Sequence, residues 1–147
     1  MFIGKYYHNL EAKGRVLLPK LLRQNEKDWV VTRGLDGCLF IFTKNQFAVQ
    51  LKPHADSPFT QKNNRDFLRL MAGEAVEVNT DSLGRINLPD HLIEAGQLKK
   101  NVVVVGAINR IELWDLAVYH QYLNRLLPQA EKIAEGQNYV TSTSPTL

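Results

Sequence analysis

The alternation of apolar runs with polar turns predicts two short β-hairpins, one in each half of the chain. We expect strands at residues 29–32 and 38–42 in the first half, and at residues 102–105 and 110–114 in the second. Each strand is a run of four or five mostly apolar residues, and a loop that contains glycine joins the two strands of each pair. A helix is expected after each hairpin.

The segment after the first hairpin carries helix start signals. Thr43, with Gln46 three residues later, forms a capping box at the start of a helix. Residues 52–57 are predicted to be a loop, followed by Ser57 and Pro58 as the N-cap and first turn of another helix, which ends near residue 72. A loop and a helix are therefore expected to connect the two halves.

A longer helix is predicted after the second hairpin, with Asp115 as its N-cap and Pro128 as the residue that bends or ends it. Its apolar residues recur at three- or four-residue spacing: Leu116, Tyr119, Leu123, Leu126, Ala130 and Ile133. This stripe is compatible with burial against a neighbouring subunit or against its own chain, because the pattern does not say what covers it. Residues 141–147, rich in Ser and Thr, are predicted to be disordered.

The chain contains an internal repeat. Residues 11–19 match residues 81–89 position for position: an acid, two variable residues, Gly, Arg, a β-branched residue, a variable residue, Leu and Pro. The hairpin residues also align between the halves, with a two-residue insertion between the two matching blocks. We therefore predict one compact unit with four parts: a first repeat at 1–52, a connecting loop and helix at 53–73, a second repeat at 74–127, and a C-terminal helix end and tail at 128–147.

Each copy of the motif predicts a turn and then a short helix. Gly14 and Gly84 permit a sharp turn or a bulge, and the closing prolines, Pro19 and Pro89, suit the first helical position. The apolar faces of these helices would be formed by Leu21, Leu22, Leu92 and Ile93. Because a small sheet with one apolar face cannot bury that face alone, the two halves must pack together. The predicted fold is mainly β with short helices (α+β), arranged as a pseudo-twofold barrel.

Composition excludes several classes of protein. No apolar run approaches the roughly 18 residues of a membrane span, and the first ten residues lack the apolar region of a signal peptide, so we expect a soluble cytoplasmic protein. Cys38 is the only cysteine and the four histidines are scattered, which predicts a buried thiol and neither a disulfide nor a metal site. No cofactor and no small-molecule substrate are expected.

Positive charge is concentrated in the first half. Residues 1–70 hold twelve Lys or Arg against six Asp or Glu, whereas residues 71–147 hold six against nine. A basic region of this kind is typical of contact with nucleic acid, although surface lysines often give the same count. The Gly-Arg element fits such a contact, because glycine lets the backbone approach a phosphate and arginine offers a planar fork for guanine or phosphate oxygens. The DNA-binding candidates are Lys5, Lys13, Gly14, Arg15, Lys20, Arg23 and Arg85.

A structural role for the two arginines is the alternative. The acid four residues before each arginine could form an ion pair that orders the turn. For Arg85, beside Asp81 and Asp90, this interpretation and DNA contact are equally supported. Arg15 lies among basic residues, which favours DNA contact.

The doubled motif, with its copies about seventy residues apart in a chain of 147 residues, resembles the MraZ family of transcriptional regulators. A single copy would indicate only the wider SpoVT/AbrB superfamily. The resemblance covers residues 1 to about 134. It implies a double-psi or swapped-hairpin barrel, a ring-shaped homo-oligomer, and binding to repeated operator sites on double-stranded DNA upstream of the division and cell-wall gene cluster, at the nucleoid. Repression and activation both stay open.

Two details test this resemblance. The family's first motif usually opens with Asp, whereas this chain has Glu11, which keeps the charge but lengthens the arm. An enzyme is the main rival, because double-psi barrels also include aspartic proteases, yet Leu83 stands where their catalytic loop needs glycine and Asp36 has no counterpart in the other half. A third possibility is an assembly module that does not bind DNA.

Overall fold

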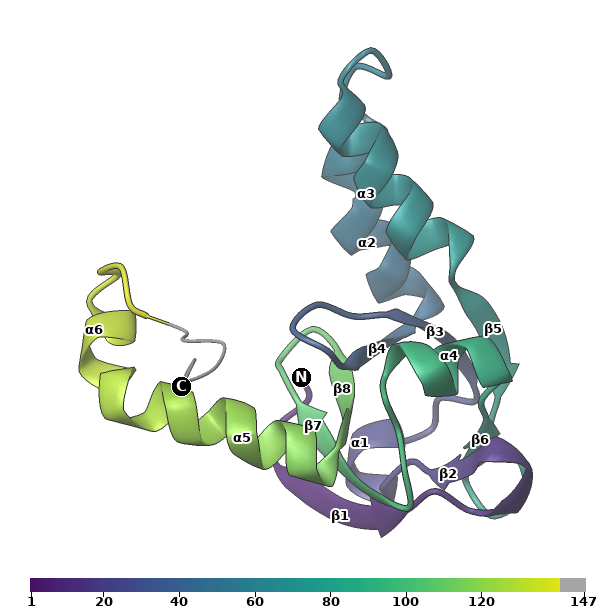
Figure 1. The fold of residues 1–147 in the computed structure, drawn as a ribbon. Coiled ribbons are helices and arrows are strands. Elements are labelled where there is room, and N and C mark those ends of the chain that lie inside the picture. The colour runs from purple at the N-terminus through teal and green to yellow at the C-terminus, as the bar shows by residue number, and fades with distance from the viewer. Residues whose placement is uncertain (141–147) are drawn as a thin grey trace. The chain divides into compact units, whose positions relative to one another are not determined.

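The computed structural model describes residues 1–140, and its elements follow the order of the repeat (Figure 1). The first repeat consists of β1 (Lys5–Asn9), a 3-10 turn (Ala12–Gly14), β2 (Arg15–Leu17), α1 (Lys20–Arg23), β3 (Asp28–Arg33), β4 (Leu39–Thr43) and α2 (Lys44–Ala55). After α3 (Lys62–Gly73), the second consists of β5 (Val76–Asn79), β6 (Arg85–Asn87), α4 (Asp90–Ala95), β7 (Asn101–Gly106), β8 (Ile111–Asp115) and α5 (Leu116–Leu126). The predicted hairpin strands are confirmed to within a residue or so.

The two repeats are interleaved in the sheets. Six antiparallel strands pair in the order β1-β7-β8-β4-β3-β5, so the first strand of each repeat pairs with the third strand of the other. Where β4 meets β8, Phe40 lies opposite Glu112, and where β2 meets β6, Val16 lies opposite Ile86. Phe40 and Glu112 occupy equivalent positions of the two repeats, as do Val16 and Ile86. The pseudo-twofold axis that relates the repeats therefore passes between β4 and β8 and between β2 and β6.

The predicted class, mainly β with short helices built from two repeats, is confirmed, but the predicted closure into a barrel is not. The six-stranded sheet is open, with β1 and β5 as its edge strands, each paired on one side. The separate β2–β6 ribbon packs its buried side chains into the core beside those of the large sheet. Closure is therefore not needed to keep the apolar face of the sheet dry.

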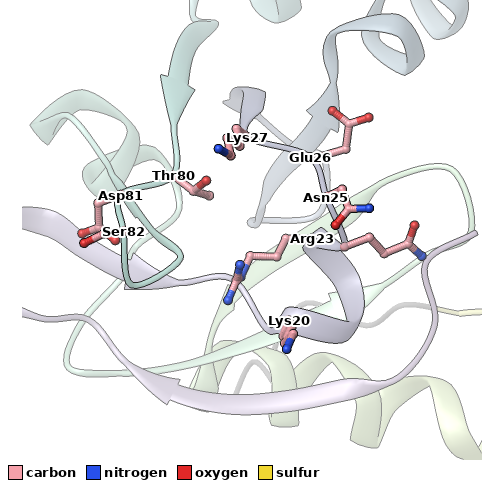
Figure 2. Close-up of a pocket in the computed structure, with 9 residues that line it drawn as sticks. Lys20, Arg23, Asn25, Glu26, Lys27, Thr80, Asp81 and Ser82 are labelled. Carbon is pink, nitrogen blue, oxygen red and sulfur yellow. The ribbon is translucent and has the colours of Figure 1, made fainter.

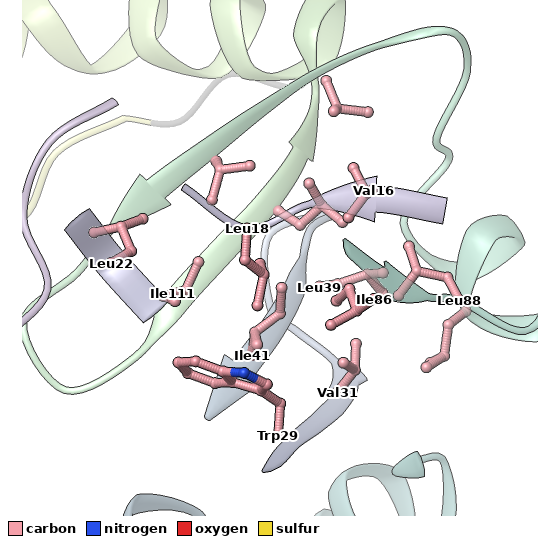
Figure 3. Packing of buried hydrophobic residues seen from close by; sticks show 14 of the residues in the cluster. Val16, Leu18, Leu22, Trp29, Val31, Leu39, Ile41, Ile86, Leu88 and Ile111 are labelled. Carbon is pink, nitrogen blue, oxygen red and sulfur yellow. The ribbon is translucent and has the colours of Figure 1, made fainter. Parts of the chain in front are cut away.

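The core lies between the β2–β6 ribbon and the large sheet (Figure 3). Alternate residues of the central strands point inward, as expected for the two-residue period of a strand: Trp29, Val31, Leu39, Ile41, Ile111 and Leu113, all fully buried. The ribbon contributes Val16 and Ile86, also fully buried. Leu22 and Leu92 extend the cluster from the short helices, but Leu21 is 75% exposed. The prediction that Leu21 and Leu22 form an apolar face together is wrong, because the single turn of α1 directs Leu22 inward and leaves Leu21 exposed. In α4, both predicted residues, Leu92 and Ile93, contact the core.

The α2–α3 hairpin covers the opposite face of β3 and β4 (Figure 1). The Thr43 side chain accepts a hydrogen bond from Gln46 N at 3.1 Å, which confirms the predicted helix cap. Two boundaries differ from prediction. Helix α2 continues through Pro53 to Ala55, and the Ser57 hydroxyl donates to the Pro53 carbonyl at 2.7 Å. Ser57 thus lies at the end of α2 and does not cap α3, which begins at Lys62 with Gln61 at the N-cap position.

The chain divides into two compact units, Met1–Asp115 and Leu116–Leu147. In the second unit, α5 ends at Leu126, and Pro128 lies in the 3-10 turn Leu127–Gln129 before α6 (Ala130–Ala134). The predicted helix end is thus confirmed. Within this unit, no residue of α5 is buried. The segment predicted to be disordered, 141–147, lies outside the described residues.

Candidate nucleic-acid interface

The two Gly-Arg loops lie at opposite ends of the β2–β6 ribbon, because each loop precedes one strand of this antiparallel pair. Their backbones share the hydrogen bond that closes the turn, but they differ at the residue before glycine, because Lys13 has a φ of 64° and Leu83 does not have a positive φ. Glu11 N donates to Arg15 O and Asp81 N donates to Arg85 O, both at 2.8 Å. Gly14 and Gly84 have φ of 75° and 83°, a region that favours glycine, so the predicted sharp turns are confirmed.

The second loop is held by Asp81. One carboxylate oxygen accepts hydrogen bonds from Leu83 N and Arg85 N at 2.9 Å, and the other accepts from Arg85 Nε at 2.8 Å. These bonds, above all the one from the Arg85 backbone, lower the pKa of Asp81. The Arg85 guanidinium also lies 3.4 Å from a Glu11 carboxylate oxygen, and its side chain is 22% exposed. Two carboxylates therefore share Arg85, and the bond to Asp81 is the main reason that the pKa of Arg85 is raised.

The first loop lacks this arrangement. The Glu11 side chain does not cap its own turn and reaches Arg85 instead. Within residues 1–140, no ion pair or side-chain hydrogen bond engages the Arg15 guanidinium. Lys13, next to it in the loop, is exposed and has a φ of 64°. The first loop thus presents two cations without an internal partner among the described residues, whereas the arginine of the second loop is neutralised.

Arg15 and Arg85 share the outer face of the ribbon. Val16 and Ile86 point into the core, so the neighbouring positions in each strand point outward. Arg15 pairs with Asn87 and Leu17 pairs with Arg85 in the register, which makes the two arginines diagonal neighbours. The two arginines are seventy residues apart in the sequence, and the structure brings them to one surface.

Arg23 and Lys20 lie beside the second loop and not beside the first, which adjoins them in sequence. Arg23 Nε donates to Leu18 O at 3.0 Å, and a Cβ added at Gly84 would lie 2.5 Å from the same nitrogen. Arg23 and Lys20 line a surface pocket with the 80–82 segment (Figure 2). The remaining candidate, Lys5, is exposed on edge strand β1, opposite Val105.

Sequence reasoning missed the other polar residues of that pocket: Gln24, Asn25, Glu26, Lys27, Thr80 and Ser82. They come from two segments more than fifty residues apart, which the hydrogen bond from Thr80 N to Lys27 O, 2.9 Å long, joins. Only the pairing of β3 with β5 could have shown that these segments meet.

Comparison with known proteins identifies the family. A family model described as "MraZ protein, putative antitoxin-like" matches the chain twice, at residues 1–70 and 71–138. The chain belongs to the MraZ family. Each match contains one Gly-Arg loop, so the resemblance predicted from the doubled motif is confirmed.

Curated relatives in the MraZ family match nearly the whole chain. One from Carboxydothermus hydrogenoformans is 40% identical over 136 residues, 92% of this chain and 95% of the relative. One from Halothermothrix orenii is 40% identical over 135 residues, which cover 91% of this chain and 94% of the relative. One from Pediococcus pentosaceus is 38% identical over 137 residues, which cover 92% of this chain and 96% of the relative. Each relative is named "Transcriptional regulator MraZ".

Other kinds of site are not seen in the part of the chain that the structure describes. Over residues 1–140, no group of three His, Cys, Asp or Glu side chains is placed to hold a metal ion. No helix in the same range is long and apolar enough to cross a membrane. Cys38 is buried, as predicted, and burial raises the pKa of its thiol far above the usual range.

Proposed function

We propose that this MraZ-family chain is a sequence-specific DNA-binding transcriptional regulator that reads DNA with its first Gly-Arg loop. The relatives' name supports a role in transcription. The observation that carries the proposal is the contrast between the loops: Arg15 has no internal partner within residues 1–140, whereas Arg85 is shared by two carboxylates. An arginine on an outer face without a counter-charge is suited to a polyanion.

The chemistry of the first loop fits both parts of DNA recognition. The planar fork of Arg15 can donate two hydrogen bonds to guanine O6 and N7 in the major groove. Lys13 and Lys5 offer point charges to backbone phosphates, which position the protein without reading sequence. Gly14 shapes the loop and does not itself face DNA, because a Cβ at this position would point at Leu88 O and Ile93 inside the protein. Arg85 would contribute mainly by ordering the ribbon.

One loop offers few base contacts, so we propose that several copies of the chain act together as a ring-shaped homo-oligomer. The apolar stripe along α5 suits this assembly, because a stripe with helical spacing can pack against another copy of the chain. Several loops on repeated operator sites gain affinity through effective concentration. We place these sites upstream of the division and cell-wall gene cluster, in the cytoplasm at the nucleoid.

Fluorescence anisotropy with labelled duplexes from that upstream region tests the proposal. We expect the native repeats to bind far more tightly than a scrambled duplex of equal length, and a single repeat to bind much more weakly than several. Equal affinity for native and scrambled duplexes would contradict sequence-specific binding. Light scattering that shows a monomer at micromolar concentration, or a single repeat that binds as tightly as several, would contradict multivalency.

A further inference from the structure

The pocket beside the second Gly-Arg loop has the features of an anion site. It is a depression of about 520 Å³ between the end of α1, the turn that follows it, and residues 80–82. Figure 2 shows the 80–82 segment on one side of the pocket and the Arg23 and Lys20 side chains across from it. The pocket is therefore formed by the first repeat on one side and the second repeat on the other.

Positive charge predominates in the pocket. Three cations line it, Lys20, Arg23 and Lys27, against the carboxylates of Glu26 and Asp81. Asp81 is already engaged by Arg85, and Figure 2 shows the Glu26 carboxylate pointing away from Lys20 and Arg23. Within the described part of the chain, neither Lys20 nor Lys27 forms an ion pair. Both ammonium groups are thus available to a ligand.

The walls of the pocket are fixed by backbone and side-chain bonds. The bond from Arg23 Nε to Leu18 O holds the guanidinium against Gly84, and Thr80 N donates to Lys27 O. The hydroxyls of Thr80 and Ser82 add donors of the kind that phosphate oxygens accept. Because Arg23 is held in place, less entropy is lost when its guanidinium binds an oxyanion.

Backbone strain occurs in the same pocket. Gln24 has φ 48° and ψ −123°, and Glu26 N donates to Arg23 O at 2.9 Å, which closes a turn over residues 23–26. These angles match the first central position of a type II′ turn, where glycine is usual. The turn after α4 in the second repeat also contains a glutamine with positive φ, Gln97 at 52°, so this conformation is a feature of both repeats. It shapes the rim of the pocket and is not itself a sign of a ligand.

The pseudo-twofold related position lacks the pocket chemistry. There, the counterparts of Lys20 and Arg23 are Asp90 and Ile93, and Ile93 packs against Gly14 as Arg23 does against Gly84. The counterparts of Thr80 and Ser82 are Leu10 and Ala12. The counterpart of Lys27 is also a lysine, Lys100, because Leu10 N donates to Lys100 O as Thr80 N donates to Lys27 O. The fold therefore does not require Lys20, Arg23 or the two hydroxyls at this place, since the equivalent contacts form without them.

We propose that this pocket binds a phosphate group through Lys20, Arg23, Lys27 and the hydroxyls of Thr80 and Ser82. The phosphate comes either from the backbone of bound DNA, in which case the inference rests on the proposed function, or from a small phosphate-bearing molecule. Arginine and lysine together with hydroxyl donors are the usual partners of phosphate oxygens in both settings.

Lys27→Gln and Ser82→Ala, with Lys62→Gln on α3 as the matched control, test the pocket in two arms. The first arm measures operator affinity against salt concentration. Lys27→Gln should weaken binding and make the log–log slope shallower by about 0.9 for each phosphate that is no longer neutralised. The second arm is calorimetric titration of the full chain, without DNA, with inorganic pyrophosphate. We expect the wild-type chain to bind pyrophosphate saturably. In Lys27→Gln the affinity should fall about tenfold, because a hydrogen bond to a charged group is lost. In Ser82→Ala the affinity should also fall.

The two arms separate the sources. Loss of operator affinity in Lys27→Gln but not in Lys62→Gln supports a DNA phosphate, and pyrophosphate binding with unchanged operator affinity supports a small phosphate-bearing ligand. Absence of both effects, in variants whose urea unfolding matches that of the wild type, overturns the proposal. If the chain binds no DNA, the proposed function is wrong, and the pyrophosphate titration still shows whether the pocket binds phosphate.

Discussion

The two Gly-Arg loops share their left-handed glycine and the hydrogen bond that closes each turn, but they hold their arginines differently. In the second loop, the short Asp81 side chain lies close enough to cap two backbone N–H groups and bind the Arg85 guanidinium. In the first loop, the extra methylene of Glu11 carries its carboxylate past the turn to Arg85. With Glu11 in place of an aspartate, Arg15 has no carboxylate partner in its own loop, and Arg85 gains a second one.

Under the proposed function, this difference would divide DNA contact and stabilisation of the ribbon between the repeats. An arginine that is already paired has a weaker attraction for phosphate, and freeing it costs the bonds it leaves. Arg15 has neither restriction within residues 1–140. A duplicated motif can therefore stabilise the ribbon with one copy and contact a partner with the other.

The largest effects on stability are expected at the two glycines. In Gly14→Ala, the new Cβ would lie 2.5 Å from the backbone oxygen of Leu88, and φ is unfavourable as well. In Gly84→Ala, the nearest atoms belong to the Arg23 side chain, which is held by a hydrogen bond to Leu18 O and can move only if that bond breaks. We expect urea denaturation to show a loss of about 3 kcal/mol or more for Gly14→Ala and about 1–2 kcal/mol for Gly84→Ala. Equal losses would show that the two loops are not held differently.

Removing the acids should affect stability unequally. Asp81→Ala leaves Leu83 N and Arg85 N without their acceptor, so we expect the melting temperature to fall by several degrees. Glu11→Ala removes only a solvent-exposed contact to Arg85 and should change the melting temperature little. Scanning calorimetry of both variants measures the difference. A larger loss in Glu11→Ala would reverse the assignment of the two loops.

The pH dependence of stability should carry a contribution from Asp81. Its pKa is lowered in the folded state, so its stabilisation is complete above the unfolded value of about 3.9 and declines as the pH falls through the folded value. Asp81→Asn keeps a side-chain acceptor in the turn but cannot titrate. The difference in unfolding free energy between the wild type and Asp81→Asn should therefore shrink below about pH 4. A difference that is constant from pH 7 to pH 3 would contradict this account.

The smallest effect is expected when the first loop is made to resemble the second. Glu11→Asp shortens the arm, so the carboxylate can cap its own turn as Asp81 does. We expect a gain of about 0.5 kcal/mol in urea denaturation, comparable to the lower range for such caps. Glu11→Gln, which keeps the longer arm, is the control and should give no gain. A loss of stability in Glu11→Asp would show that arm length does not distinguish the loops.

Much of the local structure could be predicted from the sequence, because most elements occur twice, once in each repeat, and the two copies support the same assignment. The hairpin strands, the Thr43 cap and the turns at Gly14 and Gly84 all depend on neighbouring residues. A loop is predicted from residue 52, yet helix α2 continues through Pro53 to Ala55. A proline in the last turn of a helix disrupts fewer bonds than one in the middle.

The contacts between repeats could not be predicted, because strand order is a property of the whole fold. Arg23 is eight residues from Arg15 in the sequence, but the interleaving of the repeats places it against Gly84. The pocket at Lys27 and Thr80 could not be predicted for the same reason. Charge counted along the sequence therefore identified the basic half but placed part of its charge beside the wrong loop.

The assignment of Arg15 to DNA and Arg85 to the fold is tested most directly by measuring operator affinity and urea unfolding together on Arg15→Ala and Arg85→Ala. Arg15→Ala should retain the unfolding midpoint of the wild type while operator affinity falls to that for a scrambled duplex, because removing a bidentate arginine–guanine pair costs about 1–3 kcal/mol at each site engaged. Arg85→Ala should lower the unfolding midpoint and weaken operator binding less. A folded Arg15→Ala protein with wild-type operator affinity, or loss of folding in Arg15→Ala, would contradict the account.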